Sequence, residues 1–365
     1  MANTNTAQAR WMIYGANGYT GILVAEEALR RGHRPVLAGR NRAKLEPLAE
    51  RLGLPWLALD LHDSRALQRA LGELDLVFHA AGPFVDTSDA MVRACLATRT
   101  HYLDITGEVS VFRNTYAYDQ LARESEIALL SGVGFDVVPT DCLALYVAKR
   151  LPNITQLEIA IAGIDGLSAG TAKSMLDGAG AGVLTRRAGQ LVPIPFGKGG
   201  KRIRFADRER SVLPIPWGDL ESAYRSTGVP DITTYMAFPR RLAEGARKTW
   251  LLSAAAAPLL RSALAQPSIR GLLGRLIEQR ITGPDSAARA GAKAQVWVRG
   301  SDAAGNSREA WLETADGYGF TALAGVRSVE HVLARQLRGA LTPSVAFGED
   351  FVLEIEGSER FDTLG

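Results

Sequence analysis

The sequence predicts an α/β protein: a Rossmann-type doubly wound parallel sheet, followed by a second mixed α/β domain built on a largely antiparallel sheet. Three observations support this fold class. A glycine-rich turn lies near the N-terminus, between an apolar run and an amphipathic helical segment. Short apolar runs and helical segments then alternate to about residue 135, which is typical of a parallel sheet covered by helices. Beyond residue 157, several segments alternate apolar and polar positions, as antiparallel strands with one wet face do.

The glycine-rich turn reads Gly15-Ala-Asn-Gly18-Tyr-Thr-Gly21, and it follows the apolar run 11–14. We expect the first glycine to allow a sharp turn, the second to let backbone approach a ligand, and the third to let helix and strand pack closely. The N-terminus of the helix would then point at a diphosphate, so the turn predicts dinucleotide binding. The alternative is a glycine turn that serves packing alone.

The other elements follow in order. In the first domain we expect strands at 35–38, 56–61, 76–80, 102–105 and 127–130, and helices at 42–52, 63–71, 88–97 and 116–126. In the second half we expect strands at 157–162, 201–205, 232–238, 294–299 and 309–314 and helices at 142–150 and 171–184. A helix at 326–341 and a strand at 351–355 are expected to end the chain. The predicted division is 1–145 for the dinucleotide-binding Rossmann domain, 146–325 for a second, substrate-binding α+β domain with a helical insertion at 242–279, and 326–365 for a helix and strand returning to the first domain.

Composition excludes several classes of protein. The 365 residues are 47% hydrophobic and 22% charged, and the net charge of +3 is too weak to imply nucleic acid. Two cysteines, Cys95 and Cys142, rule out a disulfide framework, and the five histidines show no metal-ligand spacing. The first eight residues lack the pattern of a secretory signal, and no apolar run reaches the roughly 20 residues of a membrane span, so a cytoplasmic location is expected.

Residues after the second, third and fourth strands indicate which cofactor binds. Arg40 stands where NAD-binding proteins usually carry an acid, and its guanidinium suits a ribose 2′-phosphate, so NADP(H) is favoured over NAD. A merely solvated Arg40 is the alternative. Asp60 could accept from the adenine amine or cap the next helix. The run Ala80-Ala81-Gly82-Pro83-Phe84 would let the cofactor lie against backbone, unless Pro83 only leads into a helix.

Candidate proton donors follow the later strands. Asp136 and Asp141 lie in and after the loop that follows the sixth strand, although Asp141 could instead be the N-cap of helix 142–150 and Asp136 a turn residue. Lys173 could polarise a carbonyl, or it could simply be solvated. Weaker candidates are Asp104, Glu108 and Tyr318.

Two further patterns have simpler explanations. The glycines of 178–182 look phosphate-binding, but they lie in a helix-like segment where close packing explains them better. The six basic residues of 198–210 stand against two acids, which fits a solvated hairpin better than an acidic ligand.

Five motifs together resemble the saccharopine dehydrogenase-like NADP-binding family, which includes trans-acting enoyl reductases. They are Tyr14-Gly-Ala-Asn-Gly-Tyr-Thr-Gly21, Ala38-Gly-Arg-Asn41, Ala80-Ala-Gly-Pro-Phe84, Tyr102-Leu-Asp-Ile-Thr-Gly-Glu108 and Gly132-Val-Gly-Phe-Asp-Val-Val-Pro-Thr-Asp141. The resemblance implies a Rossmann domain, a second domain that dimerises, and NADPH as hydride donor. The cofactor residues that it implies are Gly15, Asn17, Gly18, Tyr19, Thr20, Gly21, Arg40, Asn41, Gly82, Pro83, Phe84, Gly134, Phe135 and Asp136.

The sequence therefore favours an NADPH-dependent oxidoreductase that reduces the C=C bond of an enoyl group or the C=N bond of an imine, in a small or hydrophobic substrate. The alternative is a non-catalytic NADP-binding regulatory or scaffold protein. A homodimer without nucleic acid is expected. Contact of the insertion 242–279 with a membrane surface is the weaker expectation.

Overall fold

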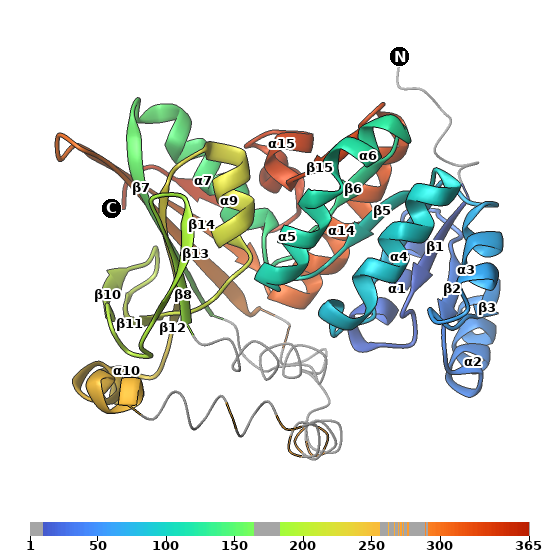
Figure 1. Ribbon diagram of the computed structural model, residues 1–365, viewed down its shortest axis with the longest axis horizontal. Coiled ribbons are helices and arrows are strands. Elements are labelled where there is room, and N and C mark those ends of the chain that lie inside the picture. Colours follow the sequence, from blue (N-terminus) through green and yellow to red (C-terminus); the bar gives the residue numbers. More distant parts are fainter. Residues whose placement is uncertain are drawn as a thin grey trace. The chain divides into compact units, whose positions relative to one another are not determined.

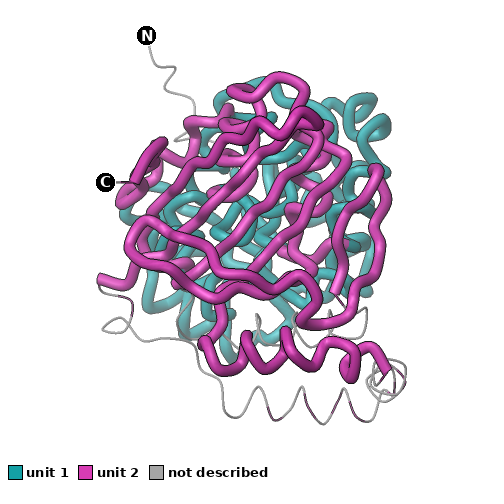
Figure 2. The backbone as a smooth tube through the Cα atoms, turned by 90° about the vertical axis from the view of Figure 1, so that its left-hand side faces the viewer, with its two compact units in different colours: residues 1–106, 110–138, 318–347 teal, residues 107–109, 139–317, 348–365 magenta. Residues whose placement is uncertain are grey.

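The computed structural model describes residues 10–163, 183–255 and 291–364, with isolated positions between 262 and 289. Its contacts divide the chain into two compact units, which Figure 2 distinguishes by colour. Unit 1 comprises Met1–Thr106, Ser110–Val138 and Tyr318–Phe347. Unit 2 comprises Gly107–Val109, Pro139–Gly317 and Gly348–Gly365.

Unit 1 is built on a seven-stranded sheet in which every pair of neighbouring strands is parallel. The strand order is β15-β6-β5-β4-β1-β2-β3. The bounds are β1 Trp11–Tyr14, β2 Val36–Gly39, β3 Trp56–Ala58, β4 Leu76–His79, β5 His101–Asp104, β6 Ala128–Leu130 and β15 Gly339–Leu341. The chain reverses its direction of winding between β1 and β4, which confirms the predicted Rossmann-type class and marks the place where such sheets bind ligands.

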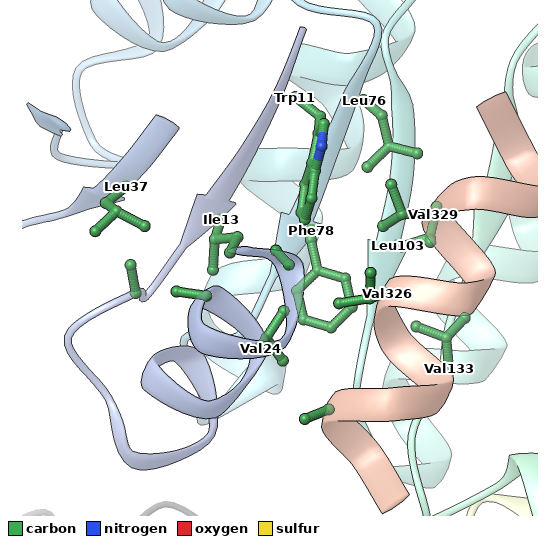
Figure 3. Close-up of a cluster of buried hydrophobic side chains, with 14 of the residues drawn as sticks. Trp11, Ile13, Val24, Leu37, Leu76, Phe78, Leu103, Val133, Val326 and Val329 are labelled. Carbon is green, nitrogen blue, oxygen red and sulfur yellow. The ribbon is translucent and has the colours of Figure 1, made fainter. Parts of the chain in front are cut away.

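Helices cover both faces of this sheet (Figure 1). Their bounds are α1 Tyr19–Arg30, α2 Arg42–Leu52, α3 Ser64–Leu71, α4 Phe84–Thr98, α5 Val109–Ala117, α6 Asp119–Glu124, α14 Gly317–Ala334 and α15 Pro343–Phe347. Side chains alternate along β1, so Trp11 and Ile13 enter one core with residues of α1, α2 and α14, whereas Met12 and Tyr14 enter the other with residues of α3, α4 and α6. Figure 3 shows the first core, in which α1 and α14 pack against the same face.

Unit 2 is built on a nine-stranded sheet of order β10-β11-β12-β7-β13-β14-β16, with β8 and β9 attached through β12. The bounds are β7 Ile154–Ala162, β8 Val183–Arg187, β9 Gln190–Ile194, β10 Lys201–Arg204, β11 Glu209–Pro214, β12 Asp231–Ala237, β13 Lys293–Asp302, β14 Ser307–Ala315 and β16 Glu359–Phe361. Its described pairs are antiparallel except β7 with β12. The largely antiparallel sheet is therefore confirmed. The helical elements are α7 Val138–Arg150, α9 Asp219–Thr227, α10 Arg240–Lys248 and the 3-10 turn η1 Phe351–Glu354.

Three predicted elements differ from the structure in their bounds or in their type. The helix expected at 326–341 begins at Gly317 and ends at Ala334, and Gly339–Leu341 form strand β15 beside β6. The strand expected at 351–355 is η1, and the last strand β16 pairs with β14 of unit 2 instead of returning to unit 1. The helix expected at 116–126 is split into α5 and α6. Of the predicted helix 171–184, all but Val183 and Leu184 lies outside the described residues, and those two begin β8.

Candidate functional site

The turn after β1 has the geometry that its glycines predict. Gly15 adopts a φ of +87°, and its carbonyl accepts from the Gly18 amide at 2.9 Å. A Cβ on Gly15 would lie 2.8 Å from the Ala80 carbonyl carbon, so the turn touches the end of β4 backbone to backbone. A Cβ on Gly21 would overlap the Gly15 carbonyl oxygen, so only glycine lets α1 pack this closely on the turn.

Gly18 is less constrained by the described residues than the other two glycines. It is the N-cap of α1 in an extended conformation, with φ of −78°, and it supplies no side-chain cap to the helix. An added Cβ would meet only the Gly15 carbonyl oxygen, at 3.2 Å. The N-terminus of α1 has no side-chain cap, and the glycines of the turn leave its backbone uncovered. Both features suit the binding of a diphosphate.

The end of β4 forms the second wall of this turn. Thr87 of α4 donates its hydroxyl to the carbonyls of Ala81 at 2.8 Å and Pro83 at 3.1 Å, which holds the Ala81-Gly82-Pro83 segment in place. Pro83 is the N-cap of α4, and Phe84 is the first residue of that helix. Pro83 therefore does lead into a helix, and the same segment also lies against the glycine turn.

Beyond β2, the structure presents a cation beside the turn. Arg40 is exposed, directly follows β2 and makes no ion pair with any described residue. Its charge acts on the Tyr14 hydroxyl, whose pKa burial raises to about 12 while Arg40 opposes that rise. Asn17 of the glycine turn lies against Gly39, where an added Cβ would come within 2.9 Å of the Asn17 amide oxygen. The guanidinium thus lies next to the glycine turn, at the edge of the sheet where the carboxyl ends of the strands meet. This edge is the rim of the candidate site.

Asn41 and Asp60 flank Arg40 with different roles. Asn41 is the N-cap of α2, because its side chain accepts from the Lys44 amide at 3.2 Å. Asp60 is exposed and accepts from the His62 amide at 3.0 Å, whereas Asp63 caps α3 by accepting from Ala66. The alternative in which Asp60 caps that helix is therefore wrong.

The opposite side of the rim includes the N-terminal part of α14, which precedes the predicted helix 326–341. The Phe135 amide donates to the Thr321 hydroxyl at 3.0 Å, and the rings of Phe135 and Phe320 lie 5.9 Å apart. The Tyr318 ring packs edge-on against Tyr19 of α1, with 4.9 Å between centroids. A segment 297 residues beyond the glycine turn, counted from residue 21 to residue 318, thus borders the turn. One residue of this segment, Tyr318, is among the weaker candidate donors that the sequence indicates.

A buried carboxylate ties two loops of the rim together. Asp104, at the end of β5, accepts from the backbone amides of Thr106 and Gly132, each at 2.9 Å. Its other oxygen accepts from the hydroxyls of Tyr102 and Ser131, each at 2.8 Å. Burial raises the pKa of Asp104 to about 6, although the four hydrogen bonds oppose that rise. Asp104 is therefore a fully bonded structural acid that joins the loops after β5 and β6.

The network continues from Asp104 to the end of β4. The Tyr102 hydroxyl donates a hydrogen bond to Asp104, so its oxygen accepts from Nδ1 of His79 at 3.2 Å. Burial lowers the pKa of His79 to about 3, which keeps the imidazole neutral. His79 also packs edge-on against Tyr14 and Phe84. One polar chain thus links the ends of β4, β5 and β6 beneath the glycine turn.

The predicted proton donors differ in the unit to which they belong and in their burial. Asp136 lies half-buried in the loop after β6, within unit 1. Asp141 is fully buried in unit 2 and accepts from the Ser226 hydroxyl at 2.8 Å. Because α7 begins at Val138, Asp141 lies inside its first turn, and the N-cap alternative is wrong. Lys173 and the glycines of 178–182 lie outside the described residues, and Glu108 is grouped with unit 2.

Taken together, unit 1 defines a dinucleotide-binding Rossmann domain. The bare helix N-terminus at α1 fits a diphosphate and the unpaired Arg40 fits a 2′-phosphate. Among the described residues no group of three metal-ligating side chains occurs.

Residues 11–130 match the family model described as the saccharopine dehydrogenase NADP-binding domain. This confirms the family resemblance inferred from the five motifs and gives NADP as the cofactor of the domain. A candidate trans-acting enoyl reductase of Mycobacterium tuberculosis is 33% identical over 180 residues, covering 46% of this chain and 43% of that protein. A saccharopine dehydrogenase-like oxidoreductase of Bos taurus is 29% identical over 160 residues, covering 38% of this chain and 37% of that protein. The matches span less than half the length of these relatives.

The fold likeness extends over both units. Apo saccharopine dehydrogenase (L-Glu forming) from Saccharomyces cerevisiae matches with a TM-score of 0.61 and covers 97% of this chain and 100% of its own. The sequence identity is 12%, so this likeness concerns the fold alone.

Proposed function

We propose that this chain is an NADPH-dependent oxidoreductase that transfers hydride to the C=C bond of an enoyl group or the C=N bond of an imine, in a small or hydrophobic substrate. The observation that carries the proposal is the pairing of an uncapped α1 N-terminus with the unpaired Arg40 on one rim. The names of the relatives, enoyl reductase and saccharopine dehydrogenase-like oxidoreductase, support reduction as the reaction class.

The cofactor would be held mainly by backbone. The turn at Gly15, Asn17 and Gly18 and the first turn of α1, with Tyr19, Thr20 and Gly21, would bind the diphosphate. Arg40 would bind the 2′-phosphate, with Asp60 placed for the adenine amine. The segment from Ala81 to Phe84 and the loop at Gly134 and Phe135 would border the nicotinamide side. NADPH would supply the hydride.

Reduction of a double bond also needs a proton at the second atom. Asp136 is half-buried in the loop after β6 of unit 1, and we propose it as the first candidate for the donor. Asp141 is a weaker candidate because its carboxyl is buried and hydrogen-bonded to Ser226. Lys173 stays a candidate from sequence alone.

The test is NADPH oxidation by the purified chain with two substrate panels, enoyl thioesters and cyclic imines. We expect turnover with members of one panel. We expect Asp136→Asn to lower kcat with little change in NADPH affinity, and the exposed Glu356→Gln to leave both unchanged. Equal kcat for Asp136→Asn and the wild type would remove Asp136 as donor.

The competing function is a non-catalytic NADP-binding regulatory or scaffold protein. The observation that favours it is that two candidate acids, Asp104 and Asp141, are fully buried and hydrogen-bonded in structural roles. Tight NADPH binding without turnover on either panel would support this function.

The expected homodimer and cytoplasmic location stay predictions. Light scattering on the purified chain would test the first, since a dimer has twice the chain mass of 39.2 kDa. None of the helices in the described part of the chain is long and apolar enough to cross a membrane.

A further inference from the structure

One exposed surface of unit 2 combines cations with large apolar side chains. It is formed by α10, by the helical turn that continues it to residue 255, and by the loop 195–200 (Figure 1). Leu251 and Leu252 are 66% and 70% exposed, the highest values among the large hydrophobic side chains that the structure describes. Phe196 in the neighbouring loop is 42% exposed. Exposed apolar side chains that gather in one place mark an interaction surface.

The cations of the same surface make no close ion pair with the described residues. Arg241 and Lys248 are exposed, and neither lies within 4.0 Å of a carboxylate of the described residues. By contrast, Arg240 is paired with Glu244 at 2.7 Å. Within residues 240–248, four basic residues stand against one acid, a net charge of +3 that equals the net charge of the whole chain.

Helical spacing brings Arg241, Lys248 and the two leucines to the same side. Lys248 follows Arg241 by seven residues, and Leu251 and Leu252 follow Lys248 by three and four. The helical bonding continues past the C-cap, since the Thr249 amide donates to Gly245 and the Ser253 amide to Thr249.

The other side of the helix is anchored in unit 2. Ala243 is buried, and Gly197 approaches so closely that a Cβ there would overlap the Ala246 carbonyl oxygen. The Ser253 hydroxyl donates to the Phe196 carbonyl at 2.8 Å, and the Lys198 ammonium lies 5.3 Å from the centre of the Trp250 ring. The exposed side chains are therefore presented from a fixed element.

We propose that this surface, made of Arg241, Lys248, Leu251 and Leu252, docks onto the face of a lipid bilayer that contains anionic headgroups. Lysine and arginine bind the headgroup phosphates, while the adjacent leucines enter the boundary of the acyl chains. A nucleic acid would match the cations but would leave the aliphatic side chains without a partner. The helix lies on the bilayer and does not span it.

The test is co-sedimentation of the full chain with vesicles of phosphatidylcholine alone and of phosphatidylcholine with phosphatidylglycerol. We expect binding to the anionic vesicles only, weakened by added salt. The double variant Arg241→Gln with Lys248→Gln should lower the affinity for anionic vesicles about 30-fold, because removal of each cation lowers it about fivefold. Leu251→Ala with Leu252→Ala should lower it by about tenfold or more. The exposed pair Arg65→Gln with Arg69→Gln on α3 is the matched control and should bind as the wild type does.

A probe on the surface gives a second readout. Both native cysteines, Cys95 and Cys142, are buried, so Leu252→Cys can be labelled selectively with an environment-sensitive dye. We expect a blue shift on anionic vesicles for this variant and none for the exposed control Leu353→Cys. Absence of vesicle binding, equal binding to neutral vesicles, unchanged binding of the variants, or no blue shift would each overturn the proposal. NADPH binding of every variant should match the wild type, so failure here is distinguishable from failure of the proposed activity.

Discussion

At the scale of single residues, cofactor choice depends on Arg40. It is exposed and unpaired, whereas its neighbour Arg42 is held by Glu46 and lies over the Trp56 ring. Because Arg40 makes no ion pair with the described residues, its guanidinium can bind a phosphate without breaking one. Arg40 and Arg42, two residues apart, therefore form a matched pair for experiment.

We expect Arg40→Ala to weaken NADPH binding tenfold to a hundredfold, because a charge-assisted contact contributes about 1.5–3 kcal/mol. NADH binding should change little, since NADH lacks the 2′-phosphate. Arg42→Ala should leave both affinities near the wild-type values. Isothermal titration of both coenzymes measures this, and equal losses for NADPH and NADH would show that Arg40 does not bind the phosphate.

Asp104 gives a pH dependence that belongs to the same scale. The folded pKa is about 6 against an ordinary value of 3.8, so the folded state binds the proton more tightly than the unfolded state does. The contribution of this group to the free energy of unfolding is therefore largest below pH 4, falls as the pH rises toward 6, and is level above that.

Relative to Asp104→Asn, the wild type should thus lose up to about 3 kcal/mol of stability between pH 4 and pH 6, at 1.36 kcal/mol for each pKa unit. Urea unfolding of both proteins at several pH values would measure the difference. A difference that stays constant from pH 4 to pH 7 would mean that Asp104 ionises as it does in water.

At the scale of elements, the strand-turn-helix unit at the N-terminus followed from the sequence because local chemistry determines it. An apolar strand, three glycines and a helix with apolar spacing admit few other structures. The N-terminus of α14 was missed because Gly317 and Gly319 resemble a turn, and helix propensity is only a weak guide. Packing of α14 against the sheet stabilises the helix instead. Gly325 approaches the Phe78 ring so closely that a Cβ on this glycine would lie 2.8 Å from the ring.

Short elements escaped sequence reasoning for a different reason. Strand β15 has three residues, too few to show a period, and its partner β6 lies more than 200 residues earlier in the chain. The segment Phe351–Glu354 is aromatic and branched, as strands are, yet it folds as a 3-10 turn. In both places long-range contacts override local preference.

The glycine turn yields a prediction at this scale. Gly18 has an ordinary φ and one near neighbour, so Gly18→Val should fold but obstruct the diphosphate, with a loss in NADPH affinity of more than about tenfold. Gly21 has no room, so Gly21→Val should lower the free energy of unfolding by about 1–3 kcal/mol or more. Thermal unfolding and coenzyme titration separate the two. Unimpaired binding by Gly18→Val would place the diphosphate elsewhere.

At the scale of the whole molecule, the sequence predicted two sheets of the right kinds and the return of a late helix to unit 1, but not the second exit of the chain into unit 2. The chain leaves unit 1 after Val138, returns at Tyr318 and leaves again after Phe347. Alternating and continuous apolar patterns distinguish antiparallel from parallel strands. They carry no information about which sheet a late strand joins, so the pairing of β16 with β14 in unit 2 was not foreseen, although the return of the late helix to unit 1 was predicted.

The most direct test of the account is a calorimetric titration of the well-folded wild-type chain with NADPH and with NADH. We predict a single NADPH site on each chain, bound at least about tenfold more tightly than NADH because of the contact between Arg40 and the 2′-phosphate. Folded protein that gives no heat with either coenzyme would contradict the account, since the proposed reduction would then have no hydride donor.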